Sequence, residues 1–316
     1  MYVVPESQAH LLQNAKQGNF SLYFSRMTPW KINADSIEAK YQAGTEQKKN
    51  GTFPVYDSSI VELMTFGNKL LPQAKKALQA VHARQKQLLE SVQKQGGLVL
   101  EMKATLTSPL VCGLGSGHPT ETSLILDRNT GMPYIQSSSV KGVLRLAHAL
   151  NVAESQNTSD WLLWGRLNDD GCFIQDPRGD QVKVDDREPG LRRYFGDVNT
   201  GSQDAVRGQL VLLDAFPQSP PGLKADIMNC HFQGYYSGNS APVETEDPNP
   251  VKFMVVQEGT TFVFRVFALP LNTSQDLNGD PLLRPFDQED EKALKAMFNR
   301  AFRQLGFGGK TAVGYG

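Results

Sequence analysis

The eleven residues GFGGKTAVGYG, from Gly306 to Gly316, constrain the fold more than any other stretch. Five glycines surround Lys310 in this segment. Because glycine has no Cβ, it admits positive φ angles and lets another molecule or another part of the chain approach the backbone closely. We expect an exposed basic loop here that closes a sheet, with a glycine turn leading into a short last strand, Thr311 to Tyr315.

A glycine-rich loop before a Lys-Thr pair also occurs in nucleotide-binding P-loops, but two features argue against that assignment. The first glycine of the P-loop motif would fall at residue 304, which is Gln304. The segment Ala312 to Gly316 is too short for the helix whose N-terminus would receive the phosphates. The sequence therefore does not predict an ATPase or a GTPase.

The composition indicates a globular chain. With 316 residues and 40% hydrophobic content, the chain can bury a substantial core. It has no run of eighteen apolar residues, and MYVVPESQAH lacks the features of a signal peptide, so we expect a cytoplasmic protein without a membrane partner. Cys112, Cys172 and Cys230 lie far apart and form no CxxC pair, so we expect reduced thiols, no metal site and no cofactor.

Positive charge is concentrated in residues 1–97, which hold twelve Lys and Arg against seven Asp and Glu. From about Leu70 to Gln95 the apolar residues recur at helical spacing, with basic residues between them, and Gly96 and Gly97 end the pattern. We expect residues 1–97 to form a mostly helical N-terminal extension. Its basic surface could contact RNA or a neighbouring protein equally well.

A second basic feature follows the serine run Ser137 to Ser139, which can cap a helix that begins near Val140. Lys141 and Arg145 are four residues apart and therefore share one face at the helix start. The free backbone amides and the positive end of the helix dipole lie beside them. This combination suits a phosphate group, in addition to the ordinary packing of the apolar side of the helix.

From Leu98 onward the order of expected elements predicts an α+β fold. Strands are expected at Leu98–Leu106, Arg207–Phe216 and Val256–Leu269, helices near 140–150 and 287–305, and a short strand at the end. This βαββαβ order is the ferredoxin-like, or RRM-type, arrangement. We assign residues 98–316 to this domain, with insertions at 151–190 and 217–251.

Several motifs together resemble the RAMP superfamily of CRISPR proteins: MPYIQSSSVKGVLR, YFGDVN with GQLVLLDAF, CHFQGYY, DPNPVKFMVV and the terminal GFGGKTAVGYG. The chain is most similar to the sixth-subunit family of type III-B (Cmr) effector complexes. In RAMP backbone subunits, a Ser-Ser-x-Lys-Gly segment and the C-terminal glycine-rich loop lie against the guide RNA. The resemblance, taken with the helix start above, implies RNA contacts for Ser138, Ser139, Lys141, Gly142, Arg145, Gly306, Gly308, Gly309, Lys310 and Thr311.

The insertion Pro217–Val251 resembles the thumb of the family, a hairpin that wedges into the guide–target duplex. This resemblance implies RNA contacts for His231, Tyr235 and Tyr236. Target-cleaving relatives use an Asp in the loop after the first strand, whereas the corresponding loop here, Ser108 to Thr122, contains no Asp. The resemblance therefore implies no catalytic residue for target cleavage.

Together these features predict a non-catalytic subunit of a type III-B CRISPR effector complex that binds guide RNA and caps the backbone near the guide 3′ portion. Its partners would be guide RNA, target RNA through the complex, and other RAMP subunits. Phosphate contacts would make the affinity salt-dependent and nearly independent of sequence. Two alternatives stay open: a metal-independent endoribonuclease that processes CRISPR transcripts with His118, His231, Tyr235 or Lys141, and a scaffold that binds only proteins.

Overall fold

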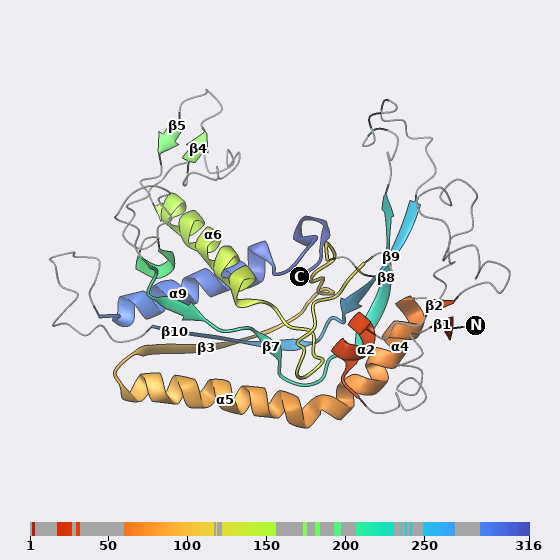
Figure 1. Ribbon diagram of the computed structural model, residues 1–316. Coiled ribbons are helices and arrows are strands. Elements are labelled where there is room, and N and C mark those ends of the chain that lie inside the picture. Colours follow the sequence, from red (N-terminus) through yellow and green to blue (C-terminus); the bar gives the residue numbers. More distant parts are fainter. Residues whose placement is uncertain are drawn as a thin grey trace.

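The computed structural model shows a central antiparallel sheet with helices on both faces and a two-stranded arm at one end (Figure 1). The structure describes residues 2–3, 18–26, 30–31, 60–116, 118, 122–155, 173–175, 181–183, 193–196, 207–230, 235, 238, 241, 249–268 and 285–316.

The N-terminal third contributes helices that pack against the rest of the chain. They are α2 (Phe20–Arg26), α4 (Ile60–Leu70), the 3₁₀ turn η3 (Leu71–Ala74) and α5 (Lys75–Lys94). The helix expected from about Leu70 is confirmed from Lys75. Pro72 lies in the 3₁₀ turn before it, where the missing N–H is tolerated. The helix buries Leu78, Val81, Leu89 and Val92, the apolar side of the helical pattern.

The central sheet is built around β10 (Thr261–Ala268), which pairs antiparallel with β3 (Leu98–Thr105), β6 (Leu210–Leu212) and β7 (Phe216–Pro217). Every residue of β10 after Thr261 is buried. Successive strand residues point to opposite faces, so Phe264 packs in the main core while Phe267 packs with Leu89 and Val92 of α5. The apolar run in this stretch therefore reflects a strand covered on both faces.

The face opposite α5 is covered by α6 (Ser137–Ser155) and α9 (Gln288–Arg300), which lie above the sheet in Figure 1. A capping box starts α9: the Asp287 carboxylate accepts hydrogen bonds from the Glu289 and Asp290 amides, and the Asp290 carboxylate accepts one from the Asp287 amide. The helix continues into the π-helical turn η5 (Ala301–Leu305). Leu144 of α6 and Phe298 of α9 are fully buried in the same core as Phe264.

The α+β class and the antiparallel strand pairs are confirmed, but two strand expectations are wrong in detail. The stretch expected as one strand, Arg207–Phe216, is divided into β6 and β7. The expected last strand is absent, because residues Thr311–Val313 form a 3₁₀ turn, η6. Lys310 and Gly314 flank this turn with φ angles of 60° and 93°, which are incompatible with an extended strand.

The described N-terminal helices share one core with the sheet. Phe20, Leu63 and Leu71 belong to the same cluster of buried side chains as Leu100 of β3 and Phe298 of α9. The core is thus continuous across residue 97.

After Pro217, which ends β7, and the connecting segment 218–222, the insertion 217–251 contributes to an antiparallel arm. It consists of β8 (Leu223–Cys230) and β9 (Asn249–Val256), with Leu223 opposite Val256. The arm rises from the end of the body near α4 (Figure 1), and the Asn68 side chain of α4 bonds to both backbone groups of Leu223. Two small sheets pair β1 (Tyr2–Val3) with β2 (Trp30–Lys31) and β4 (Phe173–Gln175) with β5 (Gln181–Lys183).

A buried polar network joins α5 to the sheet. Arg265 of β10 is only 3% exposed and donates to the Glu101 carboxylate at 2.8 Å, to Nδ1 of His82 at 2.9 Å and to Gln85 Oε1 at 2.6 Å. The other His82 nitrogen, Nε2, lies 2.9 Å from the carbonyl oxygen of Pro217, to which it donates. Burial lowers the pKa of His82. Since Nδ1 accepts from a guanidinium, the network requires the neutral ring.

Candidate nucleic-acid interface

The start of α6 is fixed by Asp214, which comes from a different part of the chain. Its Oδ1 accepts a hydrogen bond from the Ser137 amide at 2.7 Å, and Ile135 and Ala215 exchange two backbone bonds beside it. The helix therefore begins at Ser137, three residues earlier than expected from the serine run. The amides at this end were expected to be free, and one of them is capped by a carboxylate.

The Ser-Ser-x-Lys-Gly segment forms an open surface in the first turns of α6. Ser138, Ser139 and Gly142 are exposed. A Cβ added at Gly142 would meet nothing within 4 Å, so this glycine leaves space for an approaching molecule instead of filling a contact within the protein. The surface is therefore accessible to a polymer that lies across the helix start.

Three cations converge beside this surface. The pKa of Lys141 is lowered, chiefly because the side chain is partly buried and further because Arg145 and Arg207 lie close to it. Arg207 precedes β6 and is exposed, and within the described residues neither Lys141 nor Arg207 takes part in an ion pair. Like charges held together raise one another's energy, and an anion bound among them would relieve that repulsion.

Two glycines of the string, Gly308 and Gly309, pack against another part of the same chain. Gly308 has a φ angle of 90°, and a Cβ at this residue would lie 2.3 Å from the carbonyl oxygen of Val111. The Gly309 amide donates to the same carbonyl oxygen at 2.7 Å. The close approach that these glycines permit is therefore occupied by the loop after β3, and the Gly309 amide is already bonded.

The other candidate RNA-contacting residues of the string, Gly306, Lys310 and Thr311, are partly or fully exposed. Gly306, with a φ angle of 71°, donates its amide to the Ala301 carbonyl oxygen and ends η5, and Thr311 is exposed. The Lys310 ammonium lies 6.0 Å from the centre of the Phe253 ring. Gly306 and Ile135, which immediately precedes the α6 region, line one hollow of about 70 Å³. The two RNA-binding motifs expected from the sequence therefore approach each other at the end of the sheet.

The C-terminal turn also holds the base of the arm. The Tyr315 hydroxyl donates to Asp226 Oδ2 of β8 at 2.8 Å, and its ring lies 5.8 Å from that of Phe253 on β9. Burial and the Asp226 carboxylate raise the pKa of Tyr315 to about 12, so the hydroxyl remains a donor. Of the three arm residues expected to contact RNA, Tyr235 is 51% exposed, and His231 and Tyr236 lie outside the described residues.

His118, a candidate acid–base group, supports the N-terminal helix. Its Nε2 lies 2.7 Å from the carbonyl oxygen of Phe24, and its ring stacks on the Phe24 ring at 3.9 Å. Burial lowers the pKa of this histidine. These contacts give His118 a structural role, because they pack α2 against the loop after β3.

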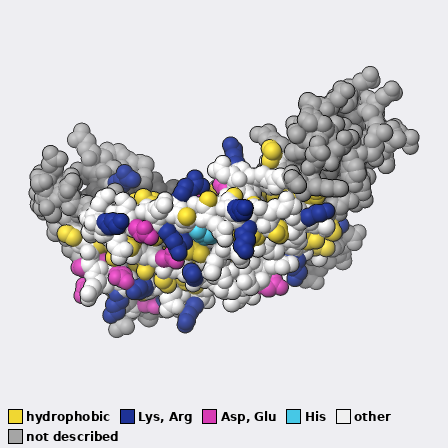
Figure 2. All heavy atoms as spheres, turned by 90° about the horizontal axis from the view of Figure 1, so that it is seen from below, with side chains coloured by type: hydrophobic (Ala, Val, Ile, Leu, Met, Phe, Trp, Pro, Cys, Tyr) yellow, Lys and Arg dark blue, Asp and Glu magenta, His cyan; other side chains and the backbone are white. Residues whose placement is uncertain are grey.

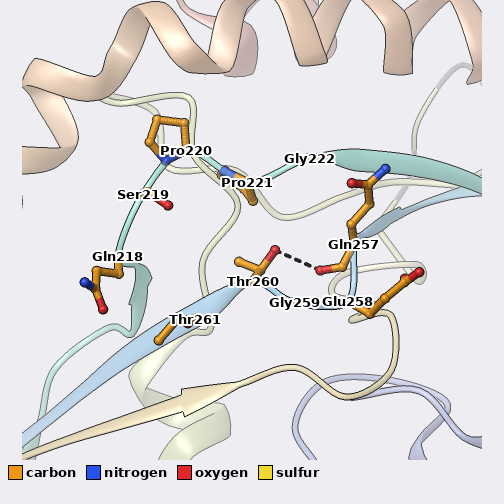
Figure 3. A pocket seen from close by; sticks show the side chains of 10 residues that line it. All are labelled: Gln218, Ser219, Pro220, Pro221, Gly222, Gln257, Glu258, Gly259, Thr260 and Thr261. Atoms are coloured by element: carbon orange, nitrogen blue, oxygen red, sulfur yellow. Dashed lines mark hydrogen bonds between the residues drawn. The ribbon is translucent and has the colours of Figure 1, made fainter.

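A polar hollow of about 400 Å³ lies beside the root of the arm, between segments 218–222 and 257–261 (Figure 3). Thr260 Oγ1 donates to the Gln257 carbonyl oxygen at 2.8 Å within the second of these segments. Among the described residues that line it, Glu258 is the only charged one, so this part of the chain offers no positive charge to a phosphate there. Within the described residues, no group of three His, Cys, Asp or Glu could hold a metal ion. In the same ranges, no helix is long and apolar enough to span a bilayer.

Comparisons with known proteins agree with the resemblance seen in the motifs. The model of the RAMP superfamily matches residues 103–316. The CRISPR system Cmr subunit Cmr6 of Pyrococcus furiosus is 29% identical over 235 residues, which cover 66% of this chain and 64% of that protein. This chain thus matches less than two thirds of the length of that relative.

Two solved structures are also similar. A chain of the type III-B Cmr-beta complex bound to cognate target RNA matches 90% of this chain and 75% of its own length, with a TM-score of 0.50 and 15% identity, and shows a shared fold. The crystal structure of Cmr6 from Pyrococcus furiosus is 27% identical and matches 70% of this chain and 97% of its own length, at a TM-score of 0.33.

Proposed function

The chain belongs to the RAMP superfamily, and from this we propose that it is a guide-RNA-binding, non-catalytic subunit of a type III-B CRISPR (Cmr) effector complex. It would cap the backbone of the complex near the guide 3′ portion and contact other Cmr subunits. The similarity to a Cmr6 subunit and the fold shared with a chain of a Cmr complex bound to target RNA support this assignment.

The observation that carries the proposal is the convergence of Lys141, Arg145 and Arg207 beside the exposed first turns of α6. A guide strand crossing this point would place phosphates among three cations and beside the hydroxyls of Ser138 and Ser139. Such contacts read the backbone and carry no base sequence. They suit a subunit that must bind guides of any sequence.

The strand order supports a ferredoxin-like ancestry for the core. The elements β3, α6, β6, β10 and α9 follow one another as the first five elements of that fold, with β10 between β3 and β6. The C-terminal turn replaces the sixth. Its Gly309 and Gly316 amides bond to the carbonyl oxygens of Val111 and Pro109, in the segment that follows β3.

The arm would act as the thumb that wedges into the guide–target duplex. Its strands β8 and β9 project from the body, and Tyr235 lies exposed beyond β8. An exposed tyrosine can stack on an unpaired or distorted base. The bond from Tyr315 to Asp226 would link the direction of the arm to the C-terminal turn that carries Lys310.

Incubation of the purified protein with CRISPR repeat RNA in EDTA tests this proposal. We expect salt-dependent retention of intact RNA. Cleavage at one site would instead favour the metal-independent endoribonuclease, although the Phe24 contact occupies His118 Nε2. Absence of any RNA retention would favour a scaffold that binds only proteins.

A further inference from the structure

The strand β3 forms one margin of the central sheet, because it pairs with β10 on one side and with no strand in the described ranges on the other. Glu101, Lys103 and Thr105 are exposed along it. Beyond its end, the Gly316 and Gly309 amides already bond to the carbonyl oxygens of Pro109 and Val111. Within the described residues, the edge therefore has no backbone partner from Val99 to Thr105.

The backbone groups that face outward can be assigned from the ladder with β10. Leu106 exchanges backbone bonds with Thr260 and Gly259, on the β10 side. Because residues alternate in an antiparallel pair, the even-numbered residues of β3 bond to β10, and Val99, Glu101, Lys103 and Thr105 direct N–H and C=O away from it. Such a row of donors and acceptors is a template for another extended strand.

We propose that this edge pairs antiparallel with the same edge of a second copy of the chain. The pairing centres on Met102, so that Glu101 of each copy lies opposite Lys103 of the other and Val99 lies opposite Thr105. The backbone N–H and C=O groups of all four residues point away from β10, as residues in a hydrogen-bonded pair of strands require. The register forms two Glu–Lys pairs on one face of the joined sheet, and opposite charges in directly opposed positions stabilise a sheet.

The charges of the edge are available for this contact. Lys103 is exposed and forms no ion pair within the described residues. The Glu101 side chain accepts from the buried Arg265 through one oxygen and is still 31% exposed. A carboxylate has several acceptor sites, so it can bond to Arg265 and to the opposing lysine together.

The opposite face of the joined strands would be apolar. In the same register, Leu98 lies opposite Leu106 and Leu100 opposite Ala104, and Met102 of one copy lies opposite Met102 of the other. Ala104 and Leu106 line the hollow of about 70 Å³ together with Phe302 and Phe307. The leucines of the second copy would therefore approach an apolar hollow at the margin of the sheet.

The choice of a second copy follows from this complementarity. A helix or an RNA strand cannot bond in turn to alternating backbone donors and acceptors at the spacing of a β-strand. The register above pairs every charge at the edge with its opposite, and because the contact is isologous it closes at a dimer. The pairing would form in the free protein, whether or not the chain binds RNA.

The mass of the free full-length chain tests the pairing. Size-exclusion chromatography with light scattering over a concentration series should show a reversible change from 34.9 kDa to twice that mass. Amide hydrogen exchange at high and low concentration should show added protection at Val99, Glu101, Lys103 and Thr105. Protein that stays monomeric at its highest soluble concentration would overturn the proposal.

Two substitutions at Lys103 locate the contact. Lys103→Glu replaces both Glu–Lys pairs by Glu–Glu and should raise the dissociation constant by about tenfold or more. Lys103→Pro removes an outward N–H, which an edge strand tolerates, and should abolish the dimer while the fold persists. The exposed Lys76 of α5 provides the control Lys76→Glu, which makes the same charge change away from the edge and should leave the dimer intact.

Circular dichroism of each variant establishes that it folds. A dimer that persists unchanged in folded Lys103→Glu and Lys103→Pro would place the contact elsewhere and refute the pairing. If Lys103→Pro fails to fold, the dissociation constants of the dimers of Lys103→Glu and Lys76→Glu are compared instead, and equal values would refute the pairing.

Discussion

Replacing Gly308 with alanine should destabilise the protein far more than the same change at the adjacent Gly309. At Gly308 the φ angle is 90°, which costs an alanine about 1–2 kcal/mol. Its Cβ would also lie 2.3 Å from the Val111 carbonyl oxygen, so the backbone must shift, and such overpacking costs about 1–3 kcal/mol. Together these costs give an expected loss of about 2–5 kcal/mol in the free energy of unfolding.

Gly309 is the matched control. Its φ angle is not positive, and a Cβ there would approach nothing closer than 3.8 Å, so Gly309→Ala should stay within about 0.5 kcal/mol of the parent. For a chain of 316 residues, the Gly308 loss corresponds to a fall of about 3–8 °C in melting temperature. Thermal melts and denaturant titrations of both variants measure the difference. Equal melting temperatures for the two would show that the contact between Gly308 and Val111 does not constrain the glycine string.

Two further predictions concern buried polar groups. Burial lowers the pKa of His82 below 6.5, so as the pH falls below that value the unfolded chain takes up a proton first and stability declines. Denaturant titrations above and below pH 6.5 should show a smaller decline for His82→Gln, and an equal decline would refute the role of the ring next to Arg265. Asp290→Ala should cost about 3–5 kcal/mol, because it removes the carboxylate that bonds to the buried Arg193 guanidinium at 2.6 Å. The exposed Glu289, in the same helical turn, should cost about 0.5 kcal/mol when changed to alanine, and equal losses for the two would contradict this account.

Local patterns in the sequence were sufficient for the elements whose structure is determined locally. The apolar run in β10 predicts a strand, and the acidic start of α9 predicts its position because the Asp287 cap lies within the same segment. The spacing of Leu78, Val81, Leu89 and Val92 likewise identifies the buried side of α5. In each case the stabilising contacts involve neighbours along the chain or a simple periodicity.

Long-range contacts decide the features that the sequence did not reveal. Asp214 caps α6 from 77 residues away, which moves the helix start to Ser137. Arg207 joins Lys141 only after β6 is placed beside α6, and no local pattern connects the two residues. The prediction of a last strand is wrong because Lys310 adopts a φ angle of 60°. Lysine has no intrinsic preference for positive φ, so the sequence does not indicate this. The positions of these residues depend on tertiary packing, which the periodicity of apolar residues in the sequence does not predict.

A salt titration of guide-RNA binding by the parent and by a triple variant in which Lys141, Arg145 and Arg207 are alanine tests most directly whether the start of α6 binds guide phosphates. We expect weaker binding and a salt slope reduced by about two, since each lost phosphate contact on single-stranded RNA removes about 0.7 from the slope. Melting temperatures should agree, because Arg145 and Arg207 are exposed and Lys141 is only partly buried.

The matched control changes three exposed cations of α5, on the other side of the sheet. Figure 2 shows that Lys and Arg side chains are spread over the side of the molecule seen from below. Removing three cations there changes the net charge as much as the α6 variant does, and so measures the effect of net charge alone on RNA affinity. The control residues are Lys76, Arg84 and Lys94. We expect a large loss of RNA affinity in the α6 variant and a small one in the α5 variant. Unchanged affinity and salt slope in the α6 variant would contradict it.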